Sequence, residues 1–139
     1  MKILITGANG YIGKSLHNAL KDKYDVTTIT RQDFDLTAVE AMIEFFDGKY
    51  FDVVLHCAVM GGSRLKEDGW NIMDVNLCMY YNLLQCRAHY GKLIHFGSGA
   101  ETNAPETPYG ISKRVIANSI SEIDNFTSIV LSGPFCFFA

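Results

Sequence analysis

The feature that most constrains this chain is a glycine-rich segment, TGANGYIG, at residues 6–13. It follows a short apolar run, Lys2–Thr6, and opens an amphipathic run, Tyr11–Lys21. Glycines at this spacing between a strand and a helix are typical of a turn that binds a dinucleotide pyrophosphate, since they allow a tight turn and close approach of the backbone. The helix N-terminus adds N–H groups and partial positive charge. A plain glycine turn is the alternative. The residues predicted to bind the cofactor here are Gly7, Asn9, Gly10, Tyr11, Ile12 and Gly13.

Apolar and amphipathic runs alternate along the rest of the chain. Strand-like runs lie at residues 25–30, 52–57, 92–96 and 127–131, and runs with helical periodicity lie between them, at 70–90 and 109–123 among others. Thr37 with Glu40 has the spacing of a capping box and predicts the start of a helix that runs through Phe46. This alternation predicts an α/β fold: a Rossmann-like, doubly wound parallel sheet of about five strands, covered on both faces, in one domain over residues 1–139.

The end of the second predicted strand bears on the choice of cofactor. An acidic residue there would bind the 2′-hydroxyl of the adenosine ribose and repel a 2′-phosphate. This chain has Thr30 and Arg31 instead, and a guanidinium pairs well with phosphate. NADP is therefore favoured, with NAD left open, and a solvated surface arginine is the alternative interpretation. Asp35 and Leu36 are expected at the adenine edge, although a turn aspartate explains Asp35 equally well.

A YxxxK element, Tyr109 to Lys113, supplies candidate catalytic residues. Spacing of four on a helix places both side chains on one face. A lysine ammonium near a phenol lowers the pKa of the phenol, so the tyrosine becomes a usable acid or base near neutral pH. Ser98 follows the fourth predicted strand, at the edge where open α/β sheets bind ligands, and its hydroxyl would hydrogen-bond a substrate carbonyl. The alternative has these residues on a helix surface and at a strand end.

Composition excludes several other classes of function. Hydrophobic residues make up 48% of the chain, and the net charge of −3 comes without a basic run, so nucleic acid is not an expected partner. No apolar stretch is long enough to cross a membrane, and the first residues lack the features of a signal peptide. We expect a reduced, cytoplasmic protein with buried thiols. We expect no metal site, because the histidines and cysteines do not follow the spacing of metal ligands; they are His17, His56, His89, His95, Cys57, Cys78, Cys86 and Cys136.

Taken together, five segments resemble the extended short-chain dehydrogenase/reductase family, the NAD(P)-dependent epimerases, dehydratases and reductases of nucleotide sugars. They are TGANGYIG at 6–13, DVVLHCA at 52–58, Val75-Asn76, FGSGAE at 96–101 and PYGISK at 108–113. The resemblance implies that Ser98, Tyr109 and Lys113 are catalytic, with Tyr109 as acid/base and Lys113 also holding the nicotinamide ribose. Asn76 would brace the sheet. The resemblance adds these residues to the predicted cofactor site: Cys57, Ala58, Val59, Asn76, Tyr109 and Lys113.

The implied function is hydride transfer at a keto or hydroxyl carbon of a nucleotide sugar. Residues 30–37 and 59–64 are most similar to the GDP-fucose synthase group, but Ala100 stands where that group has a cysteine needed for epimerisation. Family members carry a second, substrate-binding half that these 139 residues lack, so the domain is expected to be truncated at its C-terminal end. A non-catalytic NADP-binding module, or one half of a split enzyme with a complementing chain, is the alternative. Relatives pair through the helices at 70–90 and 109–123, which implies a homodimer.

Overall fold

A computed structural model describes residues 1–63 and 65–131; the apolar C-terminal tail and Cys136 lie outside this range. The chain forms one sheet of five strands in the order β2-β1-β3-β4-β5, and every neighbouring pair is parallel. The predicted α/β, Rossmann-like fold is therefore confirmed. The strands are β1 (Lys2–Thr6), β2 (Asp25–Ile29), β3 (Phe51–His56), β4 (Tyr90–Ser98) and β5 (Phe126–Leu131).

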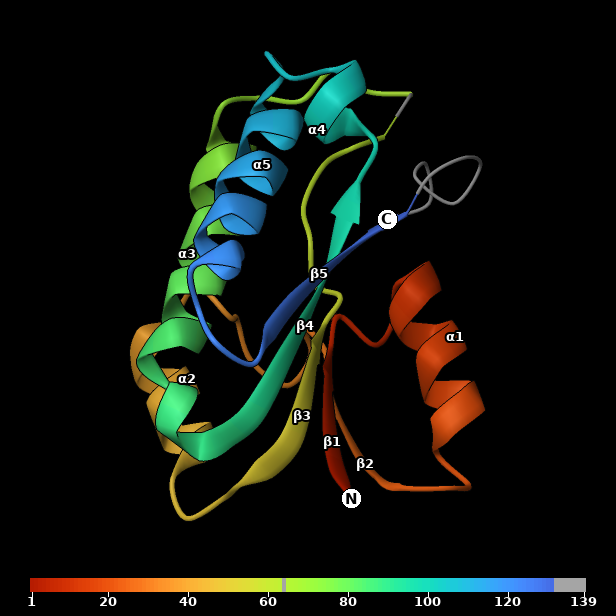
Figure 1. The fold of residues 1–139 in the computed structure, drawn as a ribbon, viewed down its shortest axis with the longest axis vertical. Coiled ribbons are helices and arrows are strands. Elements are labelled where there is room, and N and C mark those ends of the chain that lie inside the picture. The colour runs from red at the N-terminus through yellow and green to blue at the C-terminus, as the bar shows by residue number, and fades with distance from the viewer. Residues whose placement is uncertain (64, 132–139) are drawn as a thin grey trace.

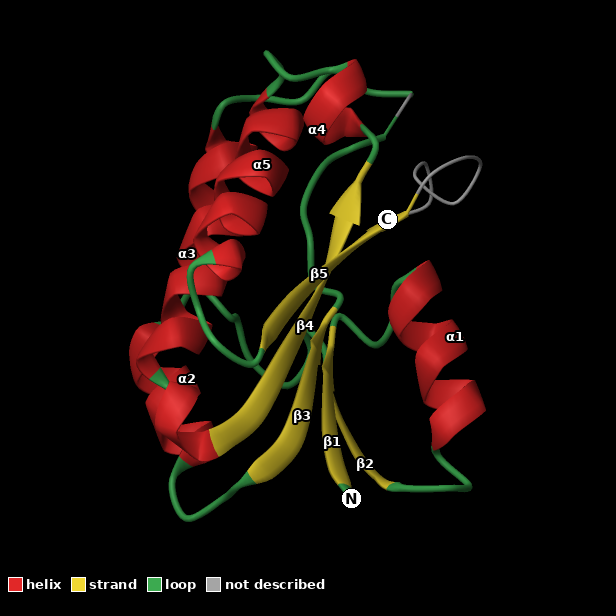
Figure 2. Cartoon of the chain, in the orientation of Figure 1, coloured by secondary structure: helices red, strands yellow, loops and turns green. Residues whose placement is uncertain are grey.

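Helices flank the sheet on both sides (Figures 1 and 2). One side holds α2 (Val39–Phe46), α3 (Asn71–Gln85) and α5 (Pro108–Ser121), and the other holds α1 (Tyr11–Leu20). A short helix, α4 (Ala100–Asn103), lies at the carboxyl edge of the sheet. The chain passes from β1 outward to β2 and then returns to the other side of β1 with β3. This reversal creates the crevice in which open α/β sheets bind their ligands.

Two apolar clusters hold the layers together. The larger lies between the sheet and α2, α3 and α5, and its fully buried members include Leu4, Val54, Leu83 and Leu93. The smaller packs α1 against β1 and β3 and includes Ile5 and Leu55, among others. Alternate residues of β1, β3 and β4 supply the two clusters because successive side chains of a strand point to opposite faces.

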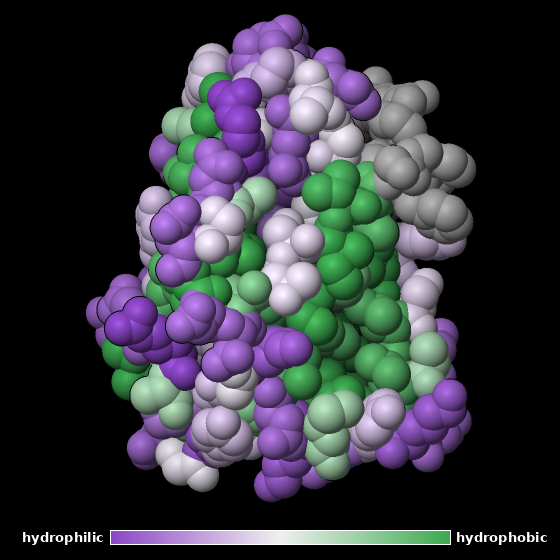
Figure 3. Space-filling model, in the orientation of Figure 1, coloured by the Kyte–Doolittle hydropathy of each residue, from purple (hydrophilic) through white to green (hydrophobic). Residues whose placement is uncertain are grey.

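The α1 side of the sheet is covered only in part. Within residues 1–63 and 65–131, α1 is the one helix on that side, and it packs against β1 and β2. Ile129 of β5, whose side chain points to this side, is 41% exposed. Figure 3 shows apolar side chains gathered over this part of the molecule, between α5 and α1. Among the described residues, helices therefore cover both faces of β1 to β3, and Ile129 of β5 is left partly exposed.

The predicted capping box at Thr37 is wrong. Helix α2 begins at Val39, its N-cap is Ala38, and no side chain caps it. The Thr37 hydroxyl instead donates to Asp35 Oδ1 at 2.8 Å, and its backbone N–H donates to the same oxygen. These two hydrogen bonds hold Thr37 in a turn with Asp35, and this local turn competes with capping of the helix by Thr37.

The helix predicted at residues 70–90 also ends early. Helix α3 stops at Gln85, a 3₁₀ turn covers Arg87–His89, and Tyr90 is the first residue of β4. Tyr90 is buried, and its hydroxyl donates to Leu83 O at 2.7 Å. Tyr90 therefore belongs to the sheet, although helical periodicity alone assigns this last apolar residue to the helix.

Leu93 offers a direct test of the larger core. It is fully buried in the middle of β4, whereas Leu65, on the loop after β3, is 94% exposed. We expect Leu93→Ala to lower the free energy of unfolding by about 2–5 kcal/mol, because it removes buried apolar contacts and leaves a cavity. Leu65→Ala should change it by less than about 0.5 kcal/mol. Urea unfolding followed by circular dichroism measures both, and similar losses for the two variants would contradict the described core.

Candidate cofactor and catalytic site

The glycine turn brings the end of β1 against the end of β3. Gly7 has a φ of +66°, and a Cβ there would lie 2.6 Å from the backbone N and Cα of Ala58. A Cβ on Gly13 would lie 2.9 Å from Ala8 Cα, where α1 packs on the turn. Both positions therefore require glycine for close backbone approach. The turn and the first two residues after β3, Cys57 and Ala58, form one continuous floor at the carboxyl edge.

The N-terminus of α1 faces this floor without a capping side chain. Its N-cap is Gly10, which makes no side-chain hydrogen bond, and its first turn holds no acidic residue. The first intrahelical bond runs from Lys14 N to Gly10 O at 2.9 Å. The first-turn N–H groups of a helix have no acceptor within the helix and carry partial positive charge. The turn therefore fits a pyrophosphate, as the sequence predicts.

A cavity of about 660 Å³ opens above the turn. The glycine turn, the loop after β2, the loop after β3 and one face of α3 line it. It gathers most of the residues predicted to bind the cofactor, namely Gly7, Asn9, Gly10, Tyr11, Ile12, Gly13, Arg31, Asp35, Leu36, Cys57, Ala58 and Val59. Asn76, Tyr109 and Lys113 are not among its lining residues. Met60, Gly61, Val75 and Met79 also line it, and the sequence had not indicated them.

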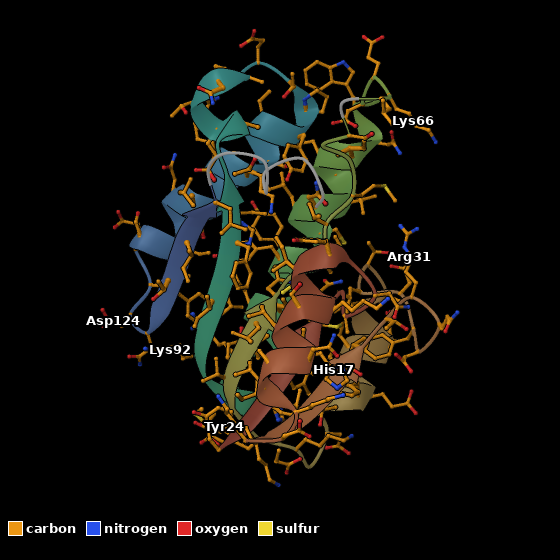
Figure 4. The ribbon with its side chains drawn as sticks, turned by 90° about the vertical axis from the view of Figure 1, so that its right-hand side faces the viewer. His17, Tyr24, Arg31, Lys66, Lys92 and Asp124 are labelled. Atoms are coloured by element: carbon orange, nitrogen blue, oxygen red, sulfur yellow. The ribbon has the colours of Figure 1, made fainter. Side chains whose placement is uncertain are left out.

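The loop after β2 forms one end of the cavity. The N–H and hydroxyl of Thr30 both donate to Asp33 Oδ2, at 2.7 and 3.1 Å, which fixes the start of the loop. Arg31 is exposed and extends outward from this loop (Figure 4). Hydrogen bonds from the Thr37 N–H and hydroxyl lower the pKa of Asp35, and the charge of Arg31 lowers it further. The exposed guanidinium of Arg31 thus lies at the rim of the cavity, near the Asp35 carboxylate, which already accepts hydrogen bonds from Thr37.

Asn76 braces the loop after β3 rather than the sheet itself. Its Oδ1 accepts from Met60 N at 2.8 Å, and its Nδ2 donates to Met60 O at 2.9 Å. The same Nδ2 lies 3.3 Å from the Ser112 hydroxyl, which in turn donates to Tyr109 O. Asn76 therefore links the cavity wall to the helix that carries the YxxxK element.

The three predicted catalytic residues lie at the carboxyl edge of β4 and the start of α5. Thr107 caps α5, since its hydroxyl oxygen accepts from Gly110 N, and Pro108 occupies the first turn. Tyr109, Lys113 and Ser98 are each 3–4% exposed. Lys113 Nζ lies 5.7 Å from the centre of the Tyr109 ring and donates to Phe96 O at 2.6 Å.

A second glycine of the β3–α3 loop contacts the Tyr109 phenol. Gly62 has a φ of +77°, and a Cβ there would lie 2.7 Å from Tyr109 Cζ. Its N–H donates to Asp68 Oδ2 at 3.0 Å, which fixes the loop in this position. The preceding residue, Gly61, lines the cavity. Backbone alone therefore separates the cavity from the hydroxyl-bearing end of the phenol, an arrangement that no sequence spacing indicated.

Lys113 is buried beside two histidines and near the Glu101 carboxylate. Burial lowers the pKa of Lys113 to about 8, and the charge of Glu101 acts in the opposite direction. Burial and the Lys113 charge lower the pKa of His56 to about 3 and hold that of His95 well below its usual range. Both histidines are therefore uncharged at neutral pH and add no positive charge beside the ammonium.

His56 and His95 are packed residues, in agreement with the sequence prediction. His56 Nδ1 lies 2.8 Å from the Thr6 hydroxyl, and that oxygen also accepts from Ala58 N at 3.3 Å. His95 makes no ring hydrogen bond to any described residue. Within residues 1–63 and 65–131, no group of three His, Cys, Asp or Glu side chains is placed to hold a metal ion. No helix in that part of the chain is long and apolar enough to span a bilayer.

Comparison with known proteins places this site in a family. The NAD dependent epimerase/dehydratase family matches residues 3–128. CDP-abequose synthase from Yersinia pseudotuberculosis is 25% identical over 159 residues, which cover 97% of this chain and 56% of the relative.

Two solved structures illustrate the shared fold. A dTDP-4-dehydrorhamnose reductase from Clostridium acetobutylicum has a TM-score of 0.82 at 26% identity and covers 95% of this chain and 53% of its own. A GDP-L-fucose synthetase from Naegleria fowleri bound to NADP has a TM-score of 0.78 at 21% identity, with coverages of 96% and 55%.

The chain belongs to the NAD dependent epimerase/dehydratase family, which confirms the resemblance drawn from its motifs. It spans about half the length of the relatives it matches.

Alanine substitutions at two glycines with similar φ angles distinguish the cost of a positive φ from the cost of a steric clash between residue 7 and Ala58. Gly48 has a φ of +68° with no atom near its missing Cβ, whereas Gly7 faces the Ala58 backbone. We expect Gly48→Ala to cost about 1–2 kcal/mol of unfolding free energy from the backbone angle alone. Gly7→Ala should cost a further 1–3 kcal/mol, roughly, from forced overpacking. Equal losses in denaturant unfolding would contradict the close approach of β1 and β3.

Proposed function

We propose that this chain binds NADP(H) and belongs to an oxidoreductase that transfers hydride at a keto or hydroxyl carbon of a nucleotide sugar, with Tyr109 as acid/base. The observation that carries the proposal is the continuity of the site. One cavity runs from the N-terminus of α1 and Arg31 to Gly61, and the next residue, Gly62, contacts the phenol of Tyr109. The proposed phosphate-binding end and the proposed proton-transfer end are therefore adjacent, with the backbone of Gly62 between them.

The residues present fit a dinucleotide. The first-turn N–H groups of α1, from Tyr11 to Gly13, would hold the pyrophosphate, and Arg31 would pair with a 2′-phosphate. Residue 30, where an acidic side chain would repel that phosphate, is Thr30 in this chain. The Naegleria fowleri relative, which is bound to NADP, supports this choice of cofactor.

Bound NADPH supplies hydride chemistry, and the described side chains supply a proton and orientation. In the reducing direction, Tyr109 would donate its phenolic proton to the carbonyl oxygen of the substrate. The Lys113 ammonium beside the ring favours the phenolate that remains. The Ser98 hydroxyl would hydrogen-bond the same oxygen. Tyr109 and Lys113 come from one helix and Ser98 from β4, so the packing of α5 on the sheet sets their geometry.

A second candidate function is NADP(H) binding without turnover by these 139 residues. The chain covers about half of each relative, and a nucleotide sugar needs surrounding surface to be oriented and shielded from water. Under this alternative the cofactor binds as described, and conversion of the sugar requires further protein.

Cofactor preference tests the role of Arg31. Fluorescence titration should show saturable binding that favours NADPH over NADH. Arg31→Ala should weaken NADPH binding by about 10–100-fold, the loss of a charge-assisted phosphate contact, and leave NADH binding nearly unchanged. Arg87→Ala, on the 3₁₀ turn before β4 and outside the cavity lining, is the matched control. Equal weakening of both cofactors by Arg31→Ala would show that Arg31 does not read the 2′-phosphate.

Turnover tests the role of Tyr109. With NADPH and a nucleotide-linked 4-keto sugar, Tyr109→Phe should reduce kcat by about 10²-fold or more and leave NADPH affinity unchanged, because only the proton donor is removed. Tyr81→Phe, at a half-exposed tyrosine on α3, should behave as the parent chain does. Retained turnover in Tyr109→Phe would exclude the proposed acid/base. NADPH binding without turnover in the parent chain would select the second candidate function.

A further inference from the structure

The end of β4 carries two backbone groups that no neighbouring strand pairs. Strand β3 ends at His56, opposite His95, whereas β4 continues to Ser98 and is paired there only with β5. Gly99 N donates to Leu131 O on β5. Because successive peptide groups of a strand point to opposite sides, the N–H of Ser98 and the C=O of Phe96 point to the side that β3 has left. Buried backbone groups of this kind need other partners.

Two side chains of opposite charge supply those partners. Lys113 Nζ donates to Phe96 O at 2.6 Å, and Glu101 Oε1 accepts from Ser98 N at 2.9 Å. Lys113 comes from α5 and Glu101 from α4, so two helices meet at the same strand end. A charged partner makes each of these hydrogen bonds stronger than a neutral one.

Gly97 shows how closely the carboxylate of Glu101 lies against β4. A Cβ at residue 97 would lie 2.6 Å from Glu101 Oε1 and 3.2 Å from the Ser128 hydroxyl. The φ of Gly97 lies outside the left-handed range, so a Cβ there would strain no backbone angle but would displace the carboxylate from this position. The position of Glu101 is thus supported by a second observation, independent of its hydrogen bond to Ser98.

Glu101 is also the carboxylate whose charge acts on Lys113. The charged and titratable groups that face the ammonium are Glu101 from α4, Cys57 at the end of β3, His56 and His95 from the sheet, and Tyr109 on its own helix. The two histidines are uncharged, and burial raises the pKa of the Cys57 thiol to about 12, so it stays protonated. Burial disfavours the ammonium, and Glu101 favours it.

We propose that Glu101 is a positioning residue of this site: its carboxylate fixes the end of β4 at Ser98 and supplies the negative charge that accompanies the buried Lys113 ammonium. The proposal rests on the proposed function only in the roles given to Ser98 and Lys113. The proposal makes α4 part of the site. It also relates two residues of the FGSGAE segment, because Gly97 leaves room for the carboxylate of Glu101.

The ionisation of Lys113 tests this proposal directly. NMR spectra of the chain labelled with ¹³C-lysine, recorded against pH, give its titration midpoint, and Lys113→Met identifies the signal. The parent chain should titrate near pH 8. Glu101→Gln keeps an oxygen for Ser98 N but removes the charge, so the midpoint should fall by roughly one pH unit. Glu106→Gln, at an exposed carboxylate on the following loop, is the matched control and should leave the midpoint unchanged.

A merely structural role for Glu101 would not produce this pattern. An unchanged midpoint in Glu101→Gln would overturn the proposal, as would an equal fall in Glu106→Gln. If Glu101→Gln does not fold, Gly97→Ala tests the same contact by displacing the carboxylate while keeping every charge, and the midpoint should again fall; an unchanged midpoint there would also overturn it. The titration uses no cofactor or substrate, so its failure is distinguishable from failure of the proposed function.

Cofactor binding gives a second readout. At pH 6.5 Lys113 should be protonated in both the parent chain and Glu101→Gln, and their NADPH affinities should agree. At pH 8 the variant should bind NADPH several-fold more weakly, because more of its Lys113 is uncharged. A loss of affinity that is the same at both pH values would contradict a role through the charge of Lys113.

Discussion

The close approach of the glycine turn to the end of β3 is the contact on which the site depends. Gly7 lies so near the Ala58 backbone that no side chain fits between them, and Thr6 reinforces the junction through Ala58 N and His56. These contacts set β1 and β3 side by side at their carboxyl ends, where the strand order reverses. The N-terminus of α1 and the loop after β3 consequently face the same cavity, one offering helical N–H groups and the other a wall of backbone and small side chains.

The end of the site that carries the proposed catalytic residues depends on where the strands end. Because β4 runs beyond β3, its last peptide groups are left to charged side chains from α4 and α5, and these side chains are the ones that set the environment of Tyr109 and Ser98. Asn76 and Asp68 then fix the loop after β3 at Met60 and at Gly62. The phenol of Tyr109 thus lies beside Gly62 of the β3–α3 loop and Lys113 of its own helix, and hydrogen bonds hold both of these residues in place.

Local patterns predict much of this architecture. Alternating apolar and amphipathic runs place every strand to within two residues, since burial of a parallel sheet leaves a continuous apolar run in the sequence. The glycine turn and the YxxxK element are equally local. The predicted cap of α2 is wrong because the neighbouring Asp35 holds Thr37 in a turn, and the predicted end of α3 is wrong because Tyr90 pairs with β3 in the sheet. The contact of Gly62 with Tyr109 depends on how the β3–α3 loop crosses the sheet edge, which no spacing encodes.

The central claim is that the phosphate turn and the proposed acid/base belong to one site, joined through the β3–α3 loop. Amide NMR of the ¹⁵N-labelled chain titrated with NADPH tests it most directly, because every backbone N–H reports separately. The account predicts the largest shifts at residues 7–13, at Arg31, and along the β3–α3 loop from Ala58 to Gly62, with Tyr109 responding at the far end. Shifts confined to the exposed face of β5, or absent from residues 7–13, would contradict it.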